Sequence, residues 1–225
     1  MKPSSKILIL ILVLVISLTV GACGGGDRQT ATDNASSPVS AELMEQLEKL
    51  ENEILEFVPS NKHDGYAIET IKDAIDAAKS GTYGVGAILV HNETGKIMYR
   101  GKNKVFSESR SDLHAEMDVL NAFEIENKEN SRELIKEYTM FSSLESCPMC
   151  LCRIITSGLQ DVHHIADDEG GGMVHLYSQL PPVWQDISEG RTFEKADCSD
   201  ELSAIAEQVF LLTADLDSRI SNKPE

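Results

Sequence analysis

Three cysteines lie within six residues of one another in the segment LESCPMCLC, at positions 144–152. Closely spaced thiols can bind a metal ion, form a redox couple or a disulfide, or pack in a hydrophobic core. Pro148 is favoured at the first helical position, which makes Cys147 the N-cap and Cys150 the third residue of a helix. The positive end of that helix lowers the pKa of both thiols and favours thiolate. Metals and redox couples both need thiolate, so this segment alone does not separate them.

His114 and Glu116 lie upstream, in the sequence HAE. One imidazole and two thiolates make a zinc site with a fourth position open to water, which is typical of catalytic zinc. Glu116 follows the histidine by two residues and is placed to carry protons, with Asp112 as a weaker alternative. A His-x-Glu pair, then a strand, then Cys-x-x-Cys at a helix start is the signature of zinc nucleobase deaminases. We therefore predict Zn²⁺ held by His114 and the two cysteines.

The elements that must position these residues follow from hydrophobic periodicity. We expect Ser111 to cap the helix that carries His114, and Gly158 to end the cysteine helix. The segment between EGGG (169–172) and the helix at 199, which holds the single tryptophan, is expected to be irregular. Strands that alternate with helices predict a layered α/β domain. The predicted helices cover 41–58, 64–80, 111–124, 148–158 and 199–219, and the predicted strands cover 85–91, 96–101, 138–145 and 161–167.

Residues 64–167 resemble the cytidine deaminase-like superfamily, and most of all its guanine deaminase and tRNA adenosine deaminase branch. VGAILV resembles the first core strand, HAEMDVL the histidine–glutamate helix and LESCPMCLC the cysteine helix. The resemblance implies a three-layer α/β/α fold around a mixed sheet of about five strands. It also implies zinc-dependent hydrolytic deamination of an amine-bearing nucleobase, nucleoside or related heterocycle. Homodimers are common in the family, so a homodimer is expected here.

The resemblance assigns roles to three residues near the predicted metal. Glu116 would be the catalytic proton carrier. Asn103, in the sequence GKN, would match an asparagine that hydrogen-bonds the base. The backbone N–H of Ala115, near a positive helix end, would stabilise charge that develops on the substrate.

The sequence also departs from the family pattern. Ser146 and Gly84 stand where the family usually has proline, and the tail SRISNKPE lacks the aromatic residue that tends to close guanine deaminase pockets. These differences leave the identity of the substrate open without affecting the metal ligands.

Several other polar residues have two interpretations. Cys152 either packs in the core or pairs with Cys198, and Glu145 either supports the site or is a strand-end carboxylate. His163 and His164 have no ligand spacing to the site, and His175 either lines the pocket or, as we expect, is a loop histidine. DDEGGG at 167–172 lacks the spacing of a phosphate or calcium loop, which predicts a mobile turn.

The first 40 residues predict export. Two lysines, an apolar run over 7–20 and the sequence VGAC resemble a bacterial lipoprotein signal, so residues 1–22 would be removed and Cys23 lipidated. A plain secretory signal or an uncleaved anchor is the alternative. Residues 23–40 are small and polar, as in a flexible tether, and 41–225 would form the deaminase-like domain with an added N-terminal helix. The protein would then be a membrane-anchored lipoprotein of the cell envelope.

The charge balance is strongly acidic, with 20 basic and 37 acidic residues and a net charge of −17. Removing residues 1–22 takes away two lysines and no acid, which makes the charge −19. Such a field repels polyanions, so we expect a small-molecule base or nucleoside as partner and no nucleic acid. A thiol-redox protein and a non-catalytic zinc-bearing binding module are the competing hypotheses.

Overall fold

The computed structural model describes residues 39–220, so the predicted signal, Cys23 and nearly all of the tether lie outside the described residues. One sheet in the order β2-β1-β3-β4-β5 forms the centre. β1 pairs antiparallel with β2 and β3, while β3–β4 and β4–β5 are parallel, which confirms the predicted mixed sheet of five strands. The strands are β1 (Gly86–His91), β2 (Ile97–Lys102), β3 (Tyr138–Leu144), β4 (Asp161–Ala166) and β5 (Thr192–Lys195).

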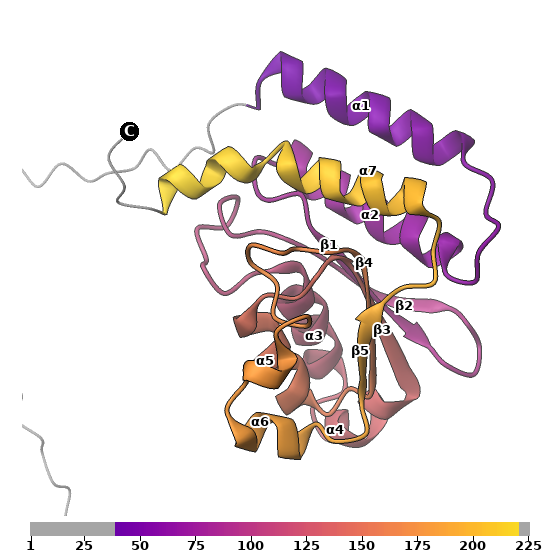
Figure 1. Cartoon of the computed structure of the whole chain (residues 1–225), viewed down its shortest axis with the longest axis vertical. Coiled ribbons are helices and arrows are strands. Elements are labelled where there is room, and N and C mark those ends of the chain that lie inside the picture. Colours follow the sequence, from indigo (N-terminus) through magenta and orange to yellow (C-terminus); the bar gives the residue numbers. More distant parts are fainter. Residues whose placement is uncertain (1–38, 221–225) are drawn as a thin grey trace, which may run out of the picture. The chain divides into compact units, whose positions relative to one another are not determined.

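Helices cover both faces of this sheet, as predicted (Figure 1). The α-helices of the described chain are α1 (Ala41–Glu56), α2 (Asp64–Lys79), α3 (Ala115–Glu126), α4 (Ser131–Leu134), α5 (Pro148–Ser157), α6 (Pro182–Ile187) and α7 (Asp200–Leu211). Three 3₁₀ turns join them, namely η1 (Ile135–Glu137), η2 (Tyr177–Gln179) and η3 (Ala214–Arg219). α2 and α7 lie side by side on one face, and α3 and α5 pack together on the other (Figure 1).

The predicted N-terminal helix is confirmed as α1, which packs on α2 and α7. Its apolar stripe buries Leu47, Leu50 and Ile54, while its opposite side faces solvent. The Ser40 hydroxyl caps the helix by accepting a hydrogen bond from the backbone N–H of Leu43. The helix is therefore part of the domain core and adds to the α2–α7 layer.

The C-terminal part of the chain differs from the prediction. α7 ends at Leu211 instead of continuing to 219, because the Thr213 hydroxyl donates to the Phe210 carbonyl and accepts from the Gly84 N–H. The chain then turns into η3. The segment between EGGG (169–172) and the helix at 199 was predicted to be irregular, but it contains α6 and supplies β5, the edge strand beside β4. A four-residue strand gives too short an alternation to be recognised in sequence.

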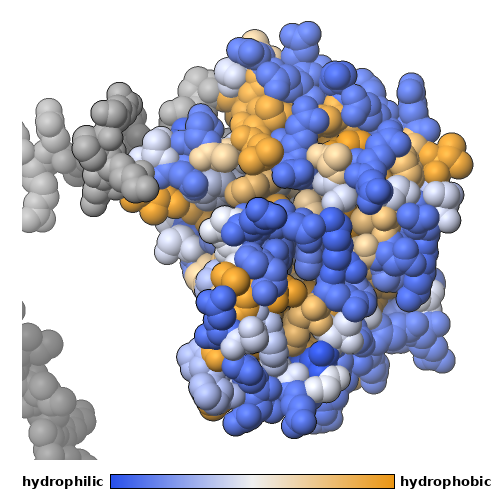
Figure 2. Space-filling model, in the orientation of Figure 1, coloured by the Kyte–Doolittle hydropathy of each residue, from blue (hydrophilic) through white to orange (hydrophobic). Residues whose placement is uncertain are grey.

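The core is continuous from α1 through the sheet to α3. β1 is buried along nearly its whole length and β3 along most of its length, as expected for central strands covered on both faces. The face seen in Figure 2 is largely hydrophilic, with hydrophobic side chains grouped over the upper helices. Within residues 39–220, every helix is too short or too polar to cross a membrane.

Candidate metal centre and cavity

The start of α3 lies three residues later than predicted, so Ser111 is not its N-cap. His114 occupies the N-cap position with an extended backbone, and its side chain makes no capping hydrogen bond. The preceding residues form a separate turn, in which Asp112 pairs with Arg110. The imidazole of His114 is therefore free to face the neighbouring helix instead of its own backbone.

The start of α5 agrees with the prediction. Cys147 is the N-cap, Pro148 the first helical residue and Cys150 the third. The helix ends at Gly158, whose φ of 95° lies in the left-handed region that favours glycine. Both thiols are thereby fixed at one helix end, in front of His114.

The ligand atoms of His114, Cys147 and Cys150 all lie within 4.8 Å of one another. Cys147 Sγ is 3.7 Å from His114 Nδ1. Tetrahedral zinc with bonds of about 2.0–2.3 Å requires ligand atoms roughly 3.3–3.8 Å apart. Two sulfurs and one ring nitrogen fit zinc in chemistry, and the distance between Cys147 Sγ and His114 Nδ1 lies within the required range.

The electrostatics of the two thiols differ. The pKa of Cys147 is lowered to about 4, first by the hydrogen bond from Cys150 and then, against the effect of burial, by His114. The pKa of Cys150 is raised well above its usual value by the same hydrogen bond and by burial. The pKa of His114 is raised, chiefly by Cys147. The surroundings of Cys147 therefore favour its thiolate form, which is the form that a metal binds.

Glu116 lies directly beside this centre and is 3 % exposed. Its Oε1 accepts a hydrogen bond of 2.9 Å from the Ser146 hydroxyl. Burial raises its pKa, and the negative charge of Cys147 raises it further. Asp112, the alternative carboxylate, is paired with Arg110 and half exposed, and it does not line the cavity described next.

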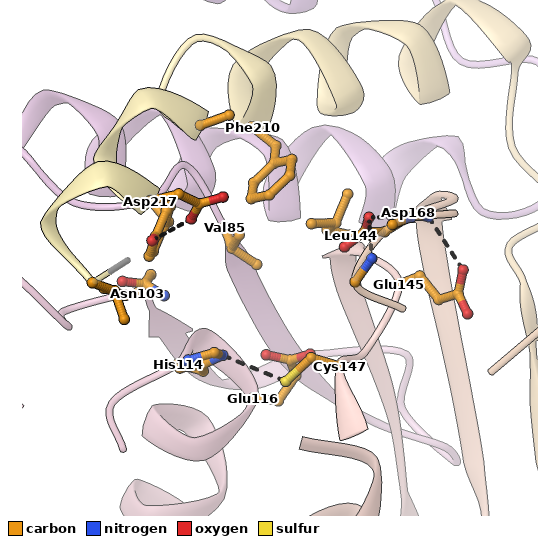
Figure 3. A pocket seen from close by; sticks show the side chains of 15 residues that line it. Val85, Asn103, His114, Glu116, Leu144, Glu145, Cys147, Asp168, Phe210 and Asp217 are labelled. Carbon is orange, nitrogen blue, oxygen red and sulfur yellow. Dashed lines mark hydrogen bonds between the residues drawn. The ribbon is translucent and has the colours of Figure 1, made fainter. Parts of the chain in front are cut away.

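A cavity of about 460 Å³ opens onto this centre. We call His114, Glu116 and Cys147 its floor, and Asp168, Phe210 and Asp217 its rim; Figure 3 shows the two sets facing each other. Cys150 is fully buried behind the floor. The remaining lining residues are Tyr83, Val85, Asn103, Leu144, Glu145, Gly170, Gly171, Ala214 and Ile220.

Asn103 lines the cavity, as predicted, and is 2 % exposed. Its Oδ1 accepts hydrogen bonds from the Thr82 hydroxyl and from the backbone N–H of Val105. These contacts fix the side chain and leave the Nδ2 group as its available donor. Ala115 is the first residue of α3 and is fully buried, but it is not itself a lining residue.

Glu145 supports the site through the loop 167–172. Its Oε2 accepts from the Asp168 N–H, and its Oε1 accepts from the backbone N–H of His175 and lies 2.8 Å from His175 Nδ1. Burial alone would raise the pKa of Glu145, but these hydrogen bonds lower it. The segment predicted to be a mobile turn is thus tied to the residue two positions before Cys147, and it forms part of the cavity wall.

The structure also shows where the other residues with two interpretations pack. Cys152 packs beside Leu151 and Ile155, and Cys198 packs against the main core; both are free thiols. Of the two strand histidines, His164 pairs with Asp167 at 3.0 Å and His163 stacks on Phe141. None of these side chains lines the cavity.

The rim was not predicted from the sequence. An aromatic residue does line the C-terminal side of the cavity. It is Phe210 in α7, which precedes the tail SRISNKPE. Asp217 in η3 accepts a hydrogen bond of 2.6 Å from the Tyr83 hydroxyl. Among the rim residues, Asp168 alone had a recognisable signal in the sequence. It follows β4, which pairs with β3, the strand that leads to Cys147.

Known proteins resemble this chain over the segment that carries the floor. Residues 61–166 match the family described as the cytidine and deoxycytidylate deaminase zinc-binding region. A tRNA-specific adenosine deaminase of Bacillus subtilis (strain 168) is 36% identical over 107 residues, which are 48% of this chain and 63% of that protein. The tRNA-specific adenosine deaminase of Rickettsia bellii (strain RML369-C) is 30% identical over 107 residues, 47% of this chain and 71% of that protein.

One solved structure, from work on A-to-I editing by tRNA:A34 deaminases at the wobble position, is similar with a TM-score of 0.53. It is 19% identical, and the match covers 64% of this chain and 99% of that one, which supports the fold. The matched segment of this chain covers less than two thirds of the length of the Bacillus subtilis relative.

Proposed function

The chain belongs to the cytidine and deoxycytidylate deaminase zinc-binding family, and we propose that it hydrolyses the exocyclic amine of a nucleobase, nucleoside or related heterocycle. Zinc is its cofactor, with His114, Cys147 and Cys150 as ligands. The observation that carries the proposal is the buried carboxylate of Glu116 beside this ligand set, on the floor of a cavity that also presents Asn103.

Hydrolytic deamination at this site would need the zinc ion, a water molecule and the carboxylate of Glu116. When bound, zinc supplies Lewis acidity, which makes water a nucleophile near neutral pH. Glu116 accepts a proton from the attacking water and passes it to the ring nitrogen, while oxygen bonds to the carbon that carries the amine. Glu116 then takes the proton of the new hydroxyl group and gives it to the amino nitrogen, so that a carbonyl forms as the C–N bond breaks and ammonia leaves. The raised pKa of Glu116 supports this role, because the carboxylate accepts a proton more readily.

Asn103 would hold the base during these transfers. Its Oδ1 is occupied by Thr82 and Val105, so its Nδ2 can donate to an acceptor on the heterocycle. The backbone N–H of Ala115 is among the first in α3 and has no acceptor within that helix, which suits the stabilisation of developing negative charge.

The charge of the cavity favours an unphosphorylated substrate. Four carboxylates line it, from Glu116, Glu145, Asp168 and Asp217, and among the described residues that line it there is no lysine or arginine. A phosphate group near the rim would meet the like charges of Asp168 and Asp217, with no lysine or arginine among the described lining residues to pair with it. We infer that the substrate is a base or nucleoside, not a nucleotide or tRNA, although the relatives named above are tRNA-specific enzymes.

The test is ammonia release by the purified zinc-loaded protein. The panel holds adenine, guanine and cytosine bases, their nucleosides, their 5′-monophosphates, a pterin and a tRNA anticodon stem-loop. We expect turnover of at least one base, nucleoside or pterin, and kcat/KM at least about tenfold lower for a matched monophosphate. Preferential turnover of the monophosphates or the stem-loop would contradict the substrate class.

A non-catalytic zinc-bearing module is the second candidate, because the ligand set would be the same. Zinc-dependent binding of a panel compound without ammonia release would favour it. A thiol-redox protein is the third, since Cys147 and Cys150 are hydrogen-bonded neighbours. A reversible Cys147–Cys150 disulfide in the purified protein, with no zinc bound, would favour that function.

We also propose that Cys23 carries a lipid that tethers the protein outside the cytoplasmic membrane. The apolar run that ends in VGAC and the polar segment behind it support this localisation. Changing Cys23 to Ser should move the protein from the membrane fraction to the soluble fraction. An unchanged partition would rule out the lipoprotein anchor.

A homodimer is a further proposal, which rests on the family resemblance alone. Sedimentation equilibrium of the protein at micromolar concentration measures its mass directly. Twice the mass of one chain is the expected result, and a monomer at all concentrations would contradict it.

A further inference from the structure

Three consecutive residues between β3 and α5 point to three different partners. Glu145 binds the loop 167–172, Cys147 faces His114, and Ser146 donates its hydroxyl to Glu116. Glu145 and Cys147 thus serve the cavity wall and the metal. Ser146 is the residue that connects this segment to the carboxylate on the floor.

The contact between Ser146 and Glu116 is isolated from water. Ser146 is 1 % exposed and Glu116 is 3 % exposed, and the Oγ–Oε1 distance is 2.9 Å. The backbone of Ser146 is held as well, because its carbonyl accepts a hydrogen bond of 2.9 Å from the Met173 N–H. A hydroxyl on a fixed backbone gives the carboxylate one defined orientation, and hydrogen bonds to charged groups are among the stronger ones in proteins.

The Ser146 contact does not depend on the state of the metal site. Ser146 is not one of the proposed metal ligands, so its hydroxyl remains a hydrogen-bond donor to Glu116 when the metal is bound.

We propose that Ser146 is a positioning residue that holds Glu116 in the orientation needed for proton transfer. This inference rests on the proposed deaminase function. Proline, which the family resemblance leads us to expect at this position, has no hydroxyl, so this chain orients its glutamate by a contact that the usual pattern lacks. An error of about 1 Å in the position of a reacting group can cost on the order of 100-fold in rate.

The kinetic test compares Ser146→Ala and Ser146→Gly with Ser146→Thr, which keeps the hydroxyl. We expect kcat to fall about tenfold or more in the first two variants, with KM within about twofold and one zinc per chain retained. The threonine variant should recover most of kcat. Ser142→Ala is the matched control, because Ser142 is a fully buried serine of β3 whose hydroxyl has no partner, and its kcat should equal that of wild type.

A second readout does not depend on activity. The melting temperatures of Ser146→Ala, Glu116→Ala and the double variant, all zinc-loaded, form a double-mutant cycle, because alanine at either position removes one partner of the hydrogen bond. We expect the double variant to shift Tm by clearly less than the sum of the single shifts, since each substitution breaks the same contact.

The outcomes distinguish failure of the positioning role of Ser146 from failure of the proposed deaminase function. Wild-type kcat in Ser146→Ala, a fall that threonine does not recover, or additive Tm shifts would each overturn the positioning role while leaving an active deaminase. A wild-type protein without turnover of any compound would overturn the proposed function, and the positioning role with it.

Discussion

The floor and the rim of the cavity are held by different kinds of contact. The floor lies at the starts of α3 and α5, two helices packed together on the sheet, and both Glu116 and the neighbouring Cys150 are almost fully buried. The rim lies on the loop after β4, on α7 and on the exposed turn η3, and Asp217 is held there by one hydrogen bond from Tyr83. The floor is therefore rigid enough for chemistry, while the rim can change with little effect on the core and can set which compounds enter.

The largest expected effect is on the floor. Glu116→Gln keeps the size of the side chain but removes its ability to accept a proton, so kcat should fall about 10²–10⁴-fold. Zinc content and Tm should stay close to wild type, because Glu116 is not a metal ligand. Asp112→Asn is the matched control and should retain activity, since Asp112 is paired with Arg110 at the surface. Loss of activity in the control with retention in Glu116→Gln would reverse the assignment.

The next effect concerns the start of α7, the helix that carries the rim residue Phe210. Asp64 is fully buried at the start of α2 and accepts hydrogen bonds from the backbone of Ser60 and Asn61 and from both the N–H and the hydroxyl of Ser199, just before α7. Asp64→Asn should lower the free energy of unfolding by about 2–3 kcal/mol at pH 7. Asp76→Asn, an exposed position on the same helix, should change it little.

The same carboxylate predicts a pH dependence. Burial alone would raise the pKa of Asp64, but its hydrogen bonds lower the pKa below the ordinary value of 3.8 for this group. A lowered pKa in the folded state gives stability that is present above pH 3.8 and is lost as the pH falls through the folded pKa. In denaturant titrations, the difference between wild type and Asp64→Asn should be constant near neutral pH and shrink below about pH 4. A difference that grows on acidification would contradict this sign.

A smaller effect is expected in the loop 167–172. A Cβ at Gly172 would lie 2.4 Å from Glu145 Cδ and 2.6 Å from the Asp168 carbonyl oxygen. Gly172→Ala must therefore displace either the loop or Glu145, at a cost of about 1–3 kcal/mol in stability, and should raise KM. Gly170→Ala, where the nearest atom is 3.7 Å away, is the control and should have the stability of wild type. Equal behaviour of the two variants would show that Glu145 does not hold the loop.

The smallest expected effect tests the charge of the rim. Asp217→Asn removes one negative charge but keeps an acceptor for Tyr83, so discrimination against a 5′-monophosphate relative to its nucleoside should fall about fivefold. Asp215→Asn, on the same turn but outside the cavity, should leave the ratio unchanged. Unchanged discrimination in both variants would mean that the rim charge does not select the substrate.

The floor could be predicted because its signals are local. The spacing of Cys147, Pro148 and Cys150 fixes a helix start, and His-x-Glu fixes the other partner of the site. The helix start at His114 was misplaced because the Arg110–Asp112 pair forms its own turn, which Ser111 alone does not reveal.

The rim could not be predicted, since its members come together only in three dimensions. Tyr83 and Asp217 are 134 residues apart in the chain, and no sequence period relates them. α7 was predicted to be too long because the contact of Thr213 with Gly84 is also long-range. Ser146 was noticed only as a departure from a family pattern, and its hydroxyl contact with Glu116 required the fold.

The central claim is that the floor is a zinc-dependent hydrolytic centre, and it is tested most directly by measuring zinc content and ammonia release on one sample through a cycle of chelation and zinc restoration. We predict about one zinc per chain held by His114, Cys147 and Cys150, loss of ammonia release on chelation, and its recovery when zinc is returned. Full ammonia release from the zinc-free protein would contradict the account.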